Sequence, residues 1–167
     1  MRILIVRHGI AEDQEAFAKT GQEDALRPLT KQGRQKMRKA AAGLKRLVGS
    51  VDVIATSPFV RAVQTGEILA RGFDGARTLQ VAALSPRKPP AALLEWVNAH
   101  GPQATIALVG HEPHLSTFLC WLLTGLQESF VVFKKGGAAL LDAANPVAAG
   151  RAKLLWMLKP SQLRDLK

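Results

Sequence analysis

Two histidines in this 167-residue chain each stand two positions beyond an apolar run of four residues. His8 follows the run ILIV after one arginine, and His111 follows the run IALV after one glycine. A neutral imidazole is nucleophilic near neutral pH and can carry a phosphoryl group covalently, which divides the transfer into two steps. A second histidine can donate hydrogen bonds to the phosphoryl oxygens as negative charge spreads over them. The repeated spacing therefore makes the two imidazoles a candidate pair for phosphoryl transfer.

Two arginines near these histidines could hold the phosphoryl oxygens. Arg7 directly precedes His8, and Arg61 stands four residues after Ser57 in the segment SPFVR. A guanidinium group offers a fixed fork of donors that matches phosphate oxygens bidentately, and it keeps its charge. Taken alone, His8 fits a structural histidine at a strand end and Arg61 fits a solvated helix residue. The prediction of a phosphoryl site therefore depends on all four side chains coming together.

The elements that must position these residues alternate between strand and helix. Apolar runs predict the strands, and apolar positions three and four residues apart predict the helices, with Thr30 as an N-cap. The predicted strands cover 2–6, 51–56, 78–84, 104–110, 129–133, 137–143 and 152–159, and the predicted helices cover 29–49, 58–72, 90–101 and 114–125. This order predicts one α/β domain over 1–167, a three-layer α/β/α sandwich with a central, mostly parallel sheet. Ligands bind such sheets beyond the carboxyl ends of the strands, where the histidines and arginines stand.

The composition is that of a globular protein with an excess of positive charge. Hydrophobic residues make up 47% of the chain, and 23 Lys and Arg stand against 13 Asp and Glu, a formal net charge of +10. Such a charge favours anionic partners, which include phosphorylated small molecules, acidic protein surfaces and nucleic acid. Solvated basic helix faces, such as that of 31–46, explain the charge equally well without any ligand. Charge alone therefore does not choose a function.

The chain has the sequence features of a cytoplasmic protein. No apolar run approaches the ~20 residues that a membrane span needs. Arg7 and His8 interrupt the first apolar run too early for a secretory leader. The single cysteine, Cys120, lies among apolar residues and fits a small buried hydrophobe in a reducing compartment. We therefore expect a cytoplasmic protein without a membrane partner.

Other chemistries fit these residues less well. A zinc site of His8, His111 and His114 would be flanked by arginines that repel a dication, and the sequence has neither HExxH nor a cysteine pair. His114 fits better as a polar residue at a helix start. Ser57 lacks the GxSxG setting of a hydrolase nucleophile, and no GxxxxGK[ST] loop occurs. We therefore expect phosphoryl chemistry without a metal and without another cofactor.

Four segments in this order resemble the histidine phosphatase superfamily, the phosphoglycerate-mutase-like enzymes. They are RHG at 7–9, LRPLTKQGRQKM at 26–37, SPFVRAVQT at 57–65 and VGHEP at 109–113. The short chain and the second segment are similar to the bacterial phosphohistidine phosphatases of the SixA type. The resemblance implies a phosphoglycerate-mutase-like fold and a phosphatase whose nucleophile, His8, becomes phosphorylated. It further implies that Arg7, Arg61 and His111 form the phosphate pocket. Arg27 is implied to be a further contact to the phosphate or the substrate.

One departure from the superfamily pattern bears on the substrate. Larger members carry an acidic residue after the third strand that protonates the leaving alkoxide, whereas the segment 81–90, VAALSPRKPP, has no carboxylate. An alcohol leaving group, with a pKa near that of water at ~16, needs such a donor. Phosphohistidine leaves as neutral imidazole, whose conjugate acid has a pKa of ~6.5. The segment therefore favours phosphohistidine, and three carboxylates elsewhere remain as alternative acids: Glu12, Asp13 and Glu112.

The expected partner is thus a phosphorylated protein, such as a histidine-phosphotransfer domain, and two alternatives remain. One is a phosphomonoesterase of a small phosphorylated metabolite, with one of those carboxylates as the acid. The other is a non-catalytic module that binds phosphate or nucleic acid through the basic surface. Small-molecule members often close the pocket with a helical insertion after the helix 58–72, and the short RGFDGART connection lacks one. An open basic pocket suits a side chain displayed on a protein. We expect no nucleic-acid partner, because the three tryptophans lie in apolar settings typical of a core and not of base stacking: Trp96, Trp121 and Trp156.

Overall fold

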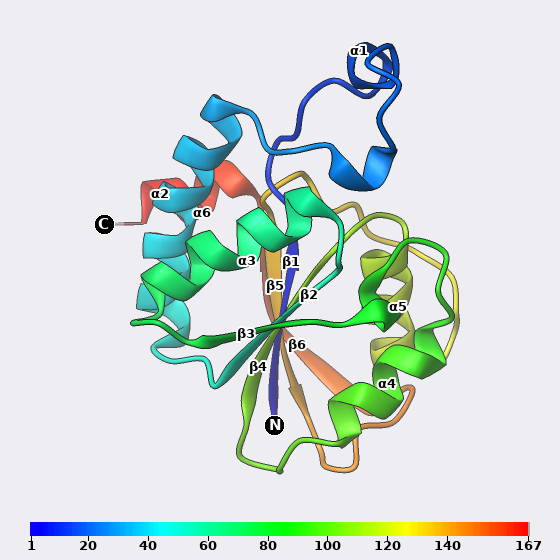
Figure 1. Ribbon diagram of the computed structural model, residues 1–167. Coiled ribbons are helices and arrows are strands. Elements are labelled where there is room, and N and C mark those ends of the chain that lie inside the picture. Colours follow the sequence, from blue (N-terminus) through cyan, green and yellow to red (C-terminus); the bar gives the residue numbers. More distant parts are fainter. Residues whose placement is uncertain (167) are drawn as a thin grey trace.

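The computed structural model describes residues 1–166, and a six-stranded sheet forms its centre (Figure 1). The strands lie in the order β3-β2-β4-β1-β5-β6. Their bounds are β1 Arg2–Arg7, β2 Val53–Thr56, β3 Arg77–Gln80, β4 Thr105–Gly110, β5 Ala138–Ala143 and β6 Ala152–Leu158. The neighbours among β1, β2, β3 and β4 pair in parallel, whereas β5 runs antiparallel to both β1 and β6. The prediction of a mostly parallel sheet is confirmed.

Helices cover both faces of the sheet, so the three-layer α/β/α arrangement is also confirmed (Figure 1). One face carries α2 (Lys31–Val48), α3 (Val60–Gly72) and α6 (Pro160–Asp165), and the other carries α4 (Pro90–Asn98) and α5 (His114–Thr124). The short helix α1 (Gln14–Ala18) stands apart, beyond the carboxyl ends of the parallel strands. Two 3-10 turns complete the fold, η1 at Asp24–Leu26 and η2 at Ala82–Leu84.

The central strand β1 shows why the parallel strands are continuously apolar. Successive side chains of a strand point to opposite faces. Ile3 and Ile5 accordingly pack in the core beneath α4 and α5, while Leu4 and Val6 pack in the core beneath α2 and α3. All four side chains have no exposed surface. Because both faces are covered, the run ILIV must end where the sheet meets solvent, and it ends at Arg7.

The start of α2 fixes the loop that follows β1. Thr30 caps the helix as predicted, since its hydroxyl accepts a hydrogen bond from the Gly33 amide at 2.8 Å. A Cβ at Gly33 would collide with the carbonyl oxygen of Ile10. The Thr30 amide donates to that same carbonyl at 3.0 Å. The loop carrying His8 is therefore held directly against the first turn of α2.

Several predicted boundaries are wrong, and tertiary contacts explain them. The strand predicted over 78–84 stops at Gln80, because the chain then turns through η2 and buries Leu84 completely. The helix predicted over 58–72 begins at Val60 with Phe59 as its N-cap, and the helix predicted over 90–101 ends at Asn98. The side chain of Asn98 bonds both backbone groups of another loop residue, Val147.

The segment 129–133 is not a strand, although its sequence SFVVF predicts one. The edge of the sheet beside β5 is occupied by β6, so this segment has no place in the ladder. Its backbone serves another purpose, because the Phe133 carbonyl oxygen accepts a hydrogen bond from Arg7. Of its apolar side chains, Phe133 is buried, whereas Phe130 and Val132 are exposed. The helices α1 and α6 were likewise not predicted from the sequence.

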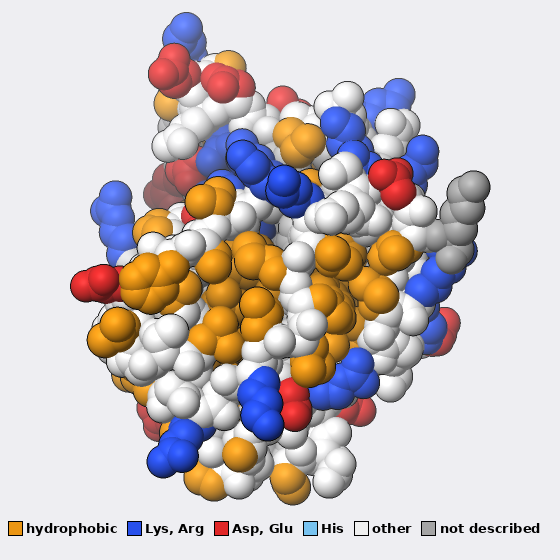
Figure 2. Space-filling model, turned by 180° about the vertical axis from the view of Figure 1, so that it is seen from behind, with side chains coloured by type: hydrophobic (Ala, Val, Ile, Leu, Met, Phe, Trp, Pro, Cys, Tyr) orange, Lys and Arg blue, Asp and Glu red, His pale blue; other side chains and the backbone are white. Residues whose placement is uncertain are grey.

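The back of the molecule carries an apolar surface that is separate from the strand ends. Figure 2 shows hydrophobic side chains gathered across the centre of this face, with lysines and arginines around them. The edge strand β6 has two exposed leucines in its middle, Leu154 and Leu155. Within residues 1–166, no helix has the length and apolar character to cross a membrane.

Candidate active site

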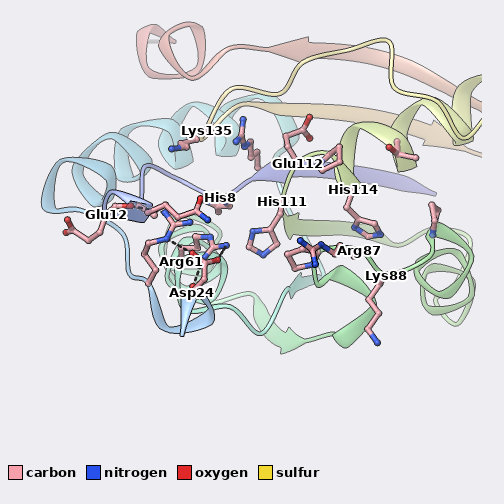
Figure 3. A pocket seen from close by; sticks show the side chains of 18 of the residues that line it. His8, Glu12, Asp24, Arg61, Arg87, Lys88, His111, Glu112, His114 and Lys135 are labelled. Atoms are coloured by element: carbon pink, nitrogen blue, oxygen red, sulfur yellow. Dashed lines mark hydrogen bonds and ion pairs between the residues drawn. The ribbon is translucent and has the colours of Figure 1, made fainter. Parts of the chain in front are cut away.

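The residues predicted to do chemistry line one pocket at the carboxyl ends of β1 and β4 (Figure 3). The pocket has a volume of about 1000 Å³. Its lining includes all five residues that the sequence singled out for the phosphoryl group and substrate: Arg7, His8, Arg27, Arg61 and His111. The parallel register explains the convergence, because Arg7 pairs with Gly110 and the His8 amide donates to the Gly110 carbonyl at 3.1 Å.

His8 is held in one tautomer at the end of β1. Its side chain is buried, and Nδ1 lies 2.7 Å from the Gly9 carbonyl oxygen. A carbonyl oxygen only accepts hydrogen bonds, so Nδ1 must carry the proton and Nε2 keeps its lone pair. Burial is the main cause that lowers the pKa of His8 to about 3, against the opposing Gly9 hydrogen bond. The imidazole is therefore neutral near pH 7, which is the form that can attack phosphorus.

A threonine of α3 ties the His8 loop to the helix that carries Arg61. The Gly9 amide donates to Thr65 Oγ1 at 3.1 Å, and the same hydroxyl donates to the Arg61 carbonyl at 2.7 Å. Thr65 has no exposed surface. The nucleophile candidate and the arginine are thus held at a fixed separation by one buried hydroxyl. The only sequence signal for Thr65 was its place at the end of SPFVRAVQT.

His111 faces His8 across the pocket. The two ring centroids lie 5.0 Å apart, with the planes tilted by 55°. His111 Nε2 lies 2.9 Å from the hydroxyl of Ser57, while Nδ1 is buried and makes no hydrogen bond within residues 1–166. Burial is the main cause that lowers the pKa of His111 to about 3, and electrostatic interactions with His8 and Arg61 lower it further. His111 therefore lines the pocket as a neutral imidazole with one unpaired ring nitrogen.

Arg7 and Arg61 each have a buried guanidinium nitrogen, Nε, that makes no hydrogen bond within residues 1–166. Arg7 Nη1 donates to the Phe133 carbonyl at 2.5 Å, and the Arg61 guanidinium lies over the Phe59 ring, 4.9 Å from its centroid. Burial lowers the pKa of both side chains, but an arginine stays protonated in proteins. The site therefore offers buried cationic donors to an anion.

Asp24 was not predicted from the sequence, and it organises two of the arginines. Its Oδ1 accepts from Arg27 Nε at 2.7 Å and its Oδ2 accepts from Arg61 Nη2 at 2.9 Å. Its carbonyl oxygen accepts from Arg61 Nη1 at 2.8 Å. Burial alone would raise the pKa of Asp24, but the hydrogen bonds and charges of the two arginines outweigh it and lower the pKa. This carboxylate is therefore ionised, and it holds Arg27 beside Arg61 at the pocket.

The alternative acids occupy different places around the pocket. Asp13 caps α1, because its Oδ1 accepts from the Ala16 amide at 2.9 Å. Glu112 accepts from the Ser116 amide at 3.2 Å, and burial raises its pKa against the effects of Ser116 and Arg7. In Figure 3 the Glu112 side chain extends away from the ring of the neighbouring His111. Glu12 lines the pocket with an exposed side chain.

Several further residues that line the pocket were not predicted from the sequence, because they lie in loops that have no periodic pattern. Arg87, Lys88, Gln127 and Lys135 belong to the connections around 81–90 and 125–137. Lys135 adds to the charges that lower the pKa of His8. His114 begins α5 as predicted, and it also lines the pocket. In the described part of the chain, no three His, Cys, Asp or Glu side chains are grouped to hold a metal ion.

Comparison with known proteins places this fold and these motifs among phosphatases. The sequence model of the histidine phosphatase superfamily (branch 1) matches residues 3–85. An uncharacterized protein of Picosynechococcus sp. is 35% identical over 152 residues, 86% of this chain and 90% of that protein. The protein histidine phosphatase SixA complexed with tungstate superposes with a TM-score of 0.80 at 24% identity, over 98% of this chain and 99% of that chain. A phosphoserine phosphatase mutant from Entamoeba histolytica, in complex with phosphoserine, superposes with a TM-score of 0.71 at 16% identity, over 97% and 98%. These two structures share the fold, so the phosphoglycerate-mutase-like fold is confirmed.

Proposed function

Because the chain belongs to the histidine phosphatase superfamily, we propose that it is a phosphohistidine phosphatase acting on other proteins. Phosphatase activity is what the family membership supports, and the proposal adds the substrate. One observation carries that choice. The segment after β3 lines the pocket with Pro86, Arg87 and Lys88, so the place where larger relatives supply an acid presents cations here.

In the first step, Nε2 of His8 attacks phosphorus and the P–N bond to the substrate imidazole breaks. The substrate ring reacts with its other nitrogen protonated, so it leaves as neutral imidazole and takes no proton from the enzyme. His8 gains the phosphoryl group on Nε2 and keeps its Nδ1 proton, which the Gly9 carbonyl holds. One P–N bond replaces another, and the step therefore requires no general acid.

In the second step, a water molecule attacks the phosphorus of phospho-His8. The P–N bond breaks and inorganic phosphate leaves with the oxygen and protons of water. His8 departs again as neutral imidazole, because Nδ1 still carries its proton. During both steps, Arg7, Arg61 and His111 surround the phosphoryl oxygens and stabilise the charge that develops on them. Arg27 adds a further contact to the phosphoryl group or substrate.

A pair of matched peptides tests the choice of substrate. The peptides carry phosphohistidine or phosphoserine at the same position in an otherwise identical sequence. General acid catalysis is typically worth about 10²–10⁴-fold, so an enzyme without the acid should hydrolyse the phosphohistidine peptide with a kcat/KM at least about 100-fold higher. A phosphoserine peptide that is hydrolysed equally well or faster would contradict the proposal.

The second candidate is a phosphomonoesterase that uses Glu112 as its acid. The raised pKa of Glu112 and its place in the pocket lining favour this function. The substitution Glu112→Gln keeps the hydrogen bond from Ser116 possible and removes the acidic proton. In a phosphomonoesterase it should lower kcat for alkyl phosphates on the order of 100-fold. In a phosphohistidine phosphatase it should change kcat for the phosphohistidine peptide by less than about 3-fold, because no proton is donated.

A further inference from the structure

We propose that the pocket contains a second anion-binding subsite, formed by Arg87, Lys88 and His114, which binds a carboxylate that the substrate carries beside its phosphoryl group. The inference rests on the proposed function for the phosphoryl end of the substrate and adds a second point of recognition. Figure 3 shows Arg87 and His114 on the side of His111 that faces away from His8. All of these residues line the same pocket.

His114 supplies the buried wall of this subsite. It is the first residue of α5, and its side chain is only 6% exposed. Both of its ring nitrogens are buried and neither has a hydrogen-bond partner among residues 1–166. Buried polar atoms are nearly always satisfied in folded proteins, and each exception needs an explanation. A carboxylate in the pocket that His114 lines would accept a hydrogen bond from the ring nitrogen that carries the proton.

Arg87 and Lys88 supply the positive charge of the subsite at the exposed side of the pocket. Both side chains are exposed, and both contribute to the pocket lining. Arg87 has a positive φ of 66°, and the Lys88 amide closes a turn on the Ser85 carbonyl at 3.3 Å. A non-glycine residue in this region of backbone space is uncommon and tends to occur where side-chain direction matters. The turn places two consecutive cations on the pocket side of the loop.

The charges of this subsite are free for a ligand. None of the ion pairs found within residues 1–166 includes Arg87 or Lys88. Two carboxylates of the pocket are already engaged, since Asp24 holds two arginines and Glu112 accepts from the Ser116 amide in the first turn of α5. Arginine and lysine only donate hydrogen bonds, so this group of side chains selects an anion.

The chemistry of the subsite indicates a carboxylate near the phosphorylated group. A guanidinium fork matches the two oxygens of a carboxylate, and the neutral His114 ring adds one donor. On a phosphoprotein the carboxylate would be an acidic side chain close to the phosphohistidine. On a small molecule it would be a carboxylate of the phosphorylated compound itself. The net charge of +10 steers either kind of ligand toward the protein.

The first test compares two phosphohistidine peptides, one with glutamate and one with glutamine beside the phosphohistidine. The wild-type protein should show a KM about 5-fold lower for the acidic peptide, the size expected for exposed ion pairs. Arg87→Gln should raise the KM of the acidic peptide toward that of the neutral one, so that the ratio of the two KM values falls to about 1. Arg151→Gln, an exposed arginine outside the pocket, is the matched control and should preserve the preference.

A binding measurement without turnover separates this proposal from the proposed function. Calorimetry compares phosphonoacetate, which carries a carboxylate, with methylphosphonate, which does not. Phosphonoacetate should bind about 5-fold more tightly to the wild-type protein, and Arg87→Gln should abolish the difference. This result would support the subsite even if phosphohistidine were a poor substrate. If the protein prefers the ligand with a carboxylate among the phosphonates but not among the peptides, the natural ligand of the subsite is a small molecule. If it shows the preference with both, the natural ligand is an acidic side chain of a phosphoprotein.

Two results would overturn the subsite. One is an equal affinity of the wild-type protein for ligands with and without the carboxylate. The other is a preference that survives Arg87→Gln in a variant whose thermal midpoint matches the wild type. Raising the salt concentration should reduce a genuine preference, because exposed charges are screened over about 10 Å at 0.1 M ionic strength.

Discussion

The two sides of the pocket hold their cations in opposite ways. On the His8 side, the guanidinium groups of Arg27 and Arg61 are fixed by the Asp24 carboxylate at 2.7 and 2.9 Å. On the other side, Arg87 and Lys88 are exposed and belong to none of the ion pairs found within residues 1–166. One side therefore consists of positioned donors and the other of exposed charges on a loop.

This difference separates chemistry from recognition. Donors that are fixed before the reaction stabilise developing charge without reorganising when it appears, which is the larger source of rate enhancement. Exposed cations on a loop contribute little energy each, but they influence which anion arrives and in which orientation. Disrupting the fixed side should therefore lower kcat, whereas disrupting the exposed side should change KM and substrate preference.

Asp24 does not touch the phosphoryl group in the proposed mechanism. Among residues of this kind, we expect the substitution Asp24→Asn to lower kcat the most. The amide keeps one acceptor but loses the charge, so Arg27 and Arg61 are no longer held together. We expect kcat to fall on the order of 10-fold or more, as for the loss of a positioned donor. We also expect inorganic phosphate to bind at least as tightly, because the competing carboxylate has been removed.

The matched control for this substitution is Asp142→Asn, which changes an exposed carboxylate of β5 outside the pocket. It should leave kcat unchanged. An unchanged kcat in Asp24→Asn would show that the arginines are positioned without this carboxylate, and the contrast between the two sides of the pocket would then disappear.

The buried imidazoles of the fixed side should also make the fold sensitive to acid. The pKa values of His8 and His111 are lowered to about 3 in the folded protein, whereas an unfolded histidine has a pKa of ~6.5. Below pH 6.5 the unfolded state therefore binds more protons than the folded state. Stability should fall as the pH is lowered from about 6.5 toward 3, by up to about 1.4 kcal/mol per pH unit for each group.

Urea unfolding at pH 7 and at pH 5 measures this loss. The variant His111→Asn removes one of the two groups, so its stability should depend less steeply on pH than that of the wild type. His100→Asn, in a residue that does not line the pocket, is the control and should retain the wild-type slope. Equal slopes in wild type and His111→Asn would contradict the neutral, buried state of His111.

The parts of the site that the sequence predicted are those set by the ends of regular strands. The runs ILIV and IALV are buried on both faces, so their ends had to place Arg7, His8 and His111 at one edge of the sheet. The N-cap at Thr30 was equally visible, because a cap depends on local spacing. Local patterns thus predicted the sheet and which side chains meet at its edge.

The parts that the sequence did not predict depend on contacts between distant segments. Asp24 and Arg61 are 37 positions apart in the sequence, and no periodic pattern predicts a contact between them. Arg87 and Lys135 lie in loops whose path is set by tertiary packing. The composition of the segment 129–133 predicts a strand, but the segment is not part of the sheet, in which β6 lies beside β5. The Phe133 carbonyl oxygen instead accepts a hydrogen bond from Arg7.

The central claim is that Nε2 of His8 carries the phosphoryl group, and trapping the intermediate tests it most directly. The protein is mixed with a ³²P-labelled phosphohistidine peptide, quenched in alkali and examined for labelled protein and for the modified peptide by mass spectrometry. We predict an acid-labile, alkali-stable label on His8, absent in His8→Ala and retained in His100→Asn. Label on another residue, or full phosphatase activity in His8→Ala, would contradict the account.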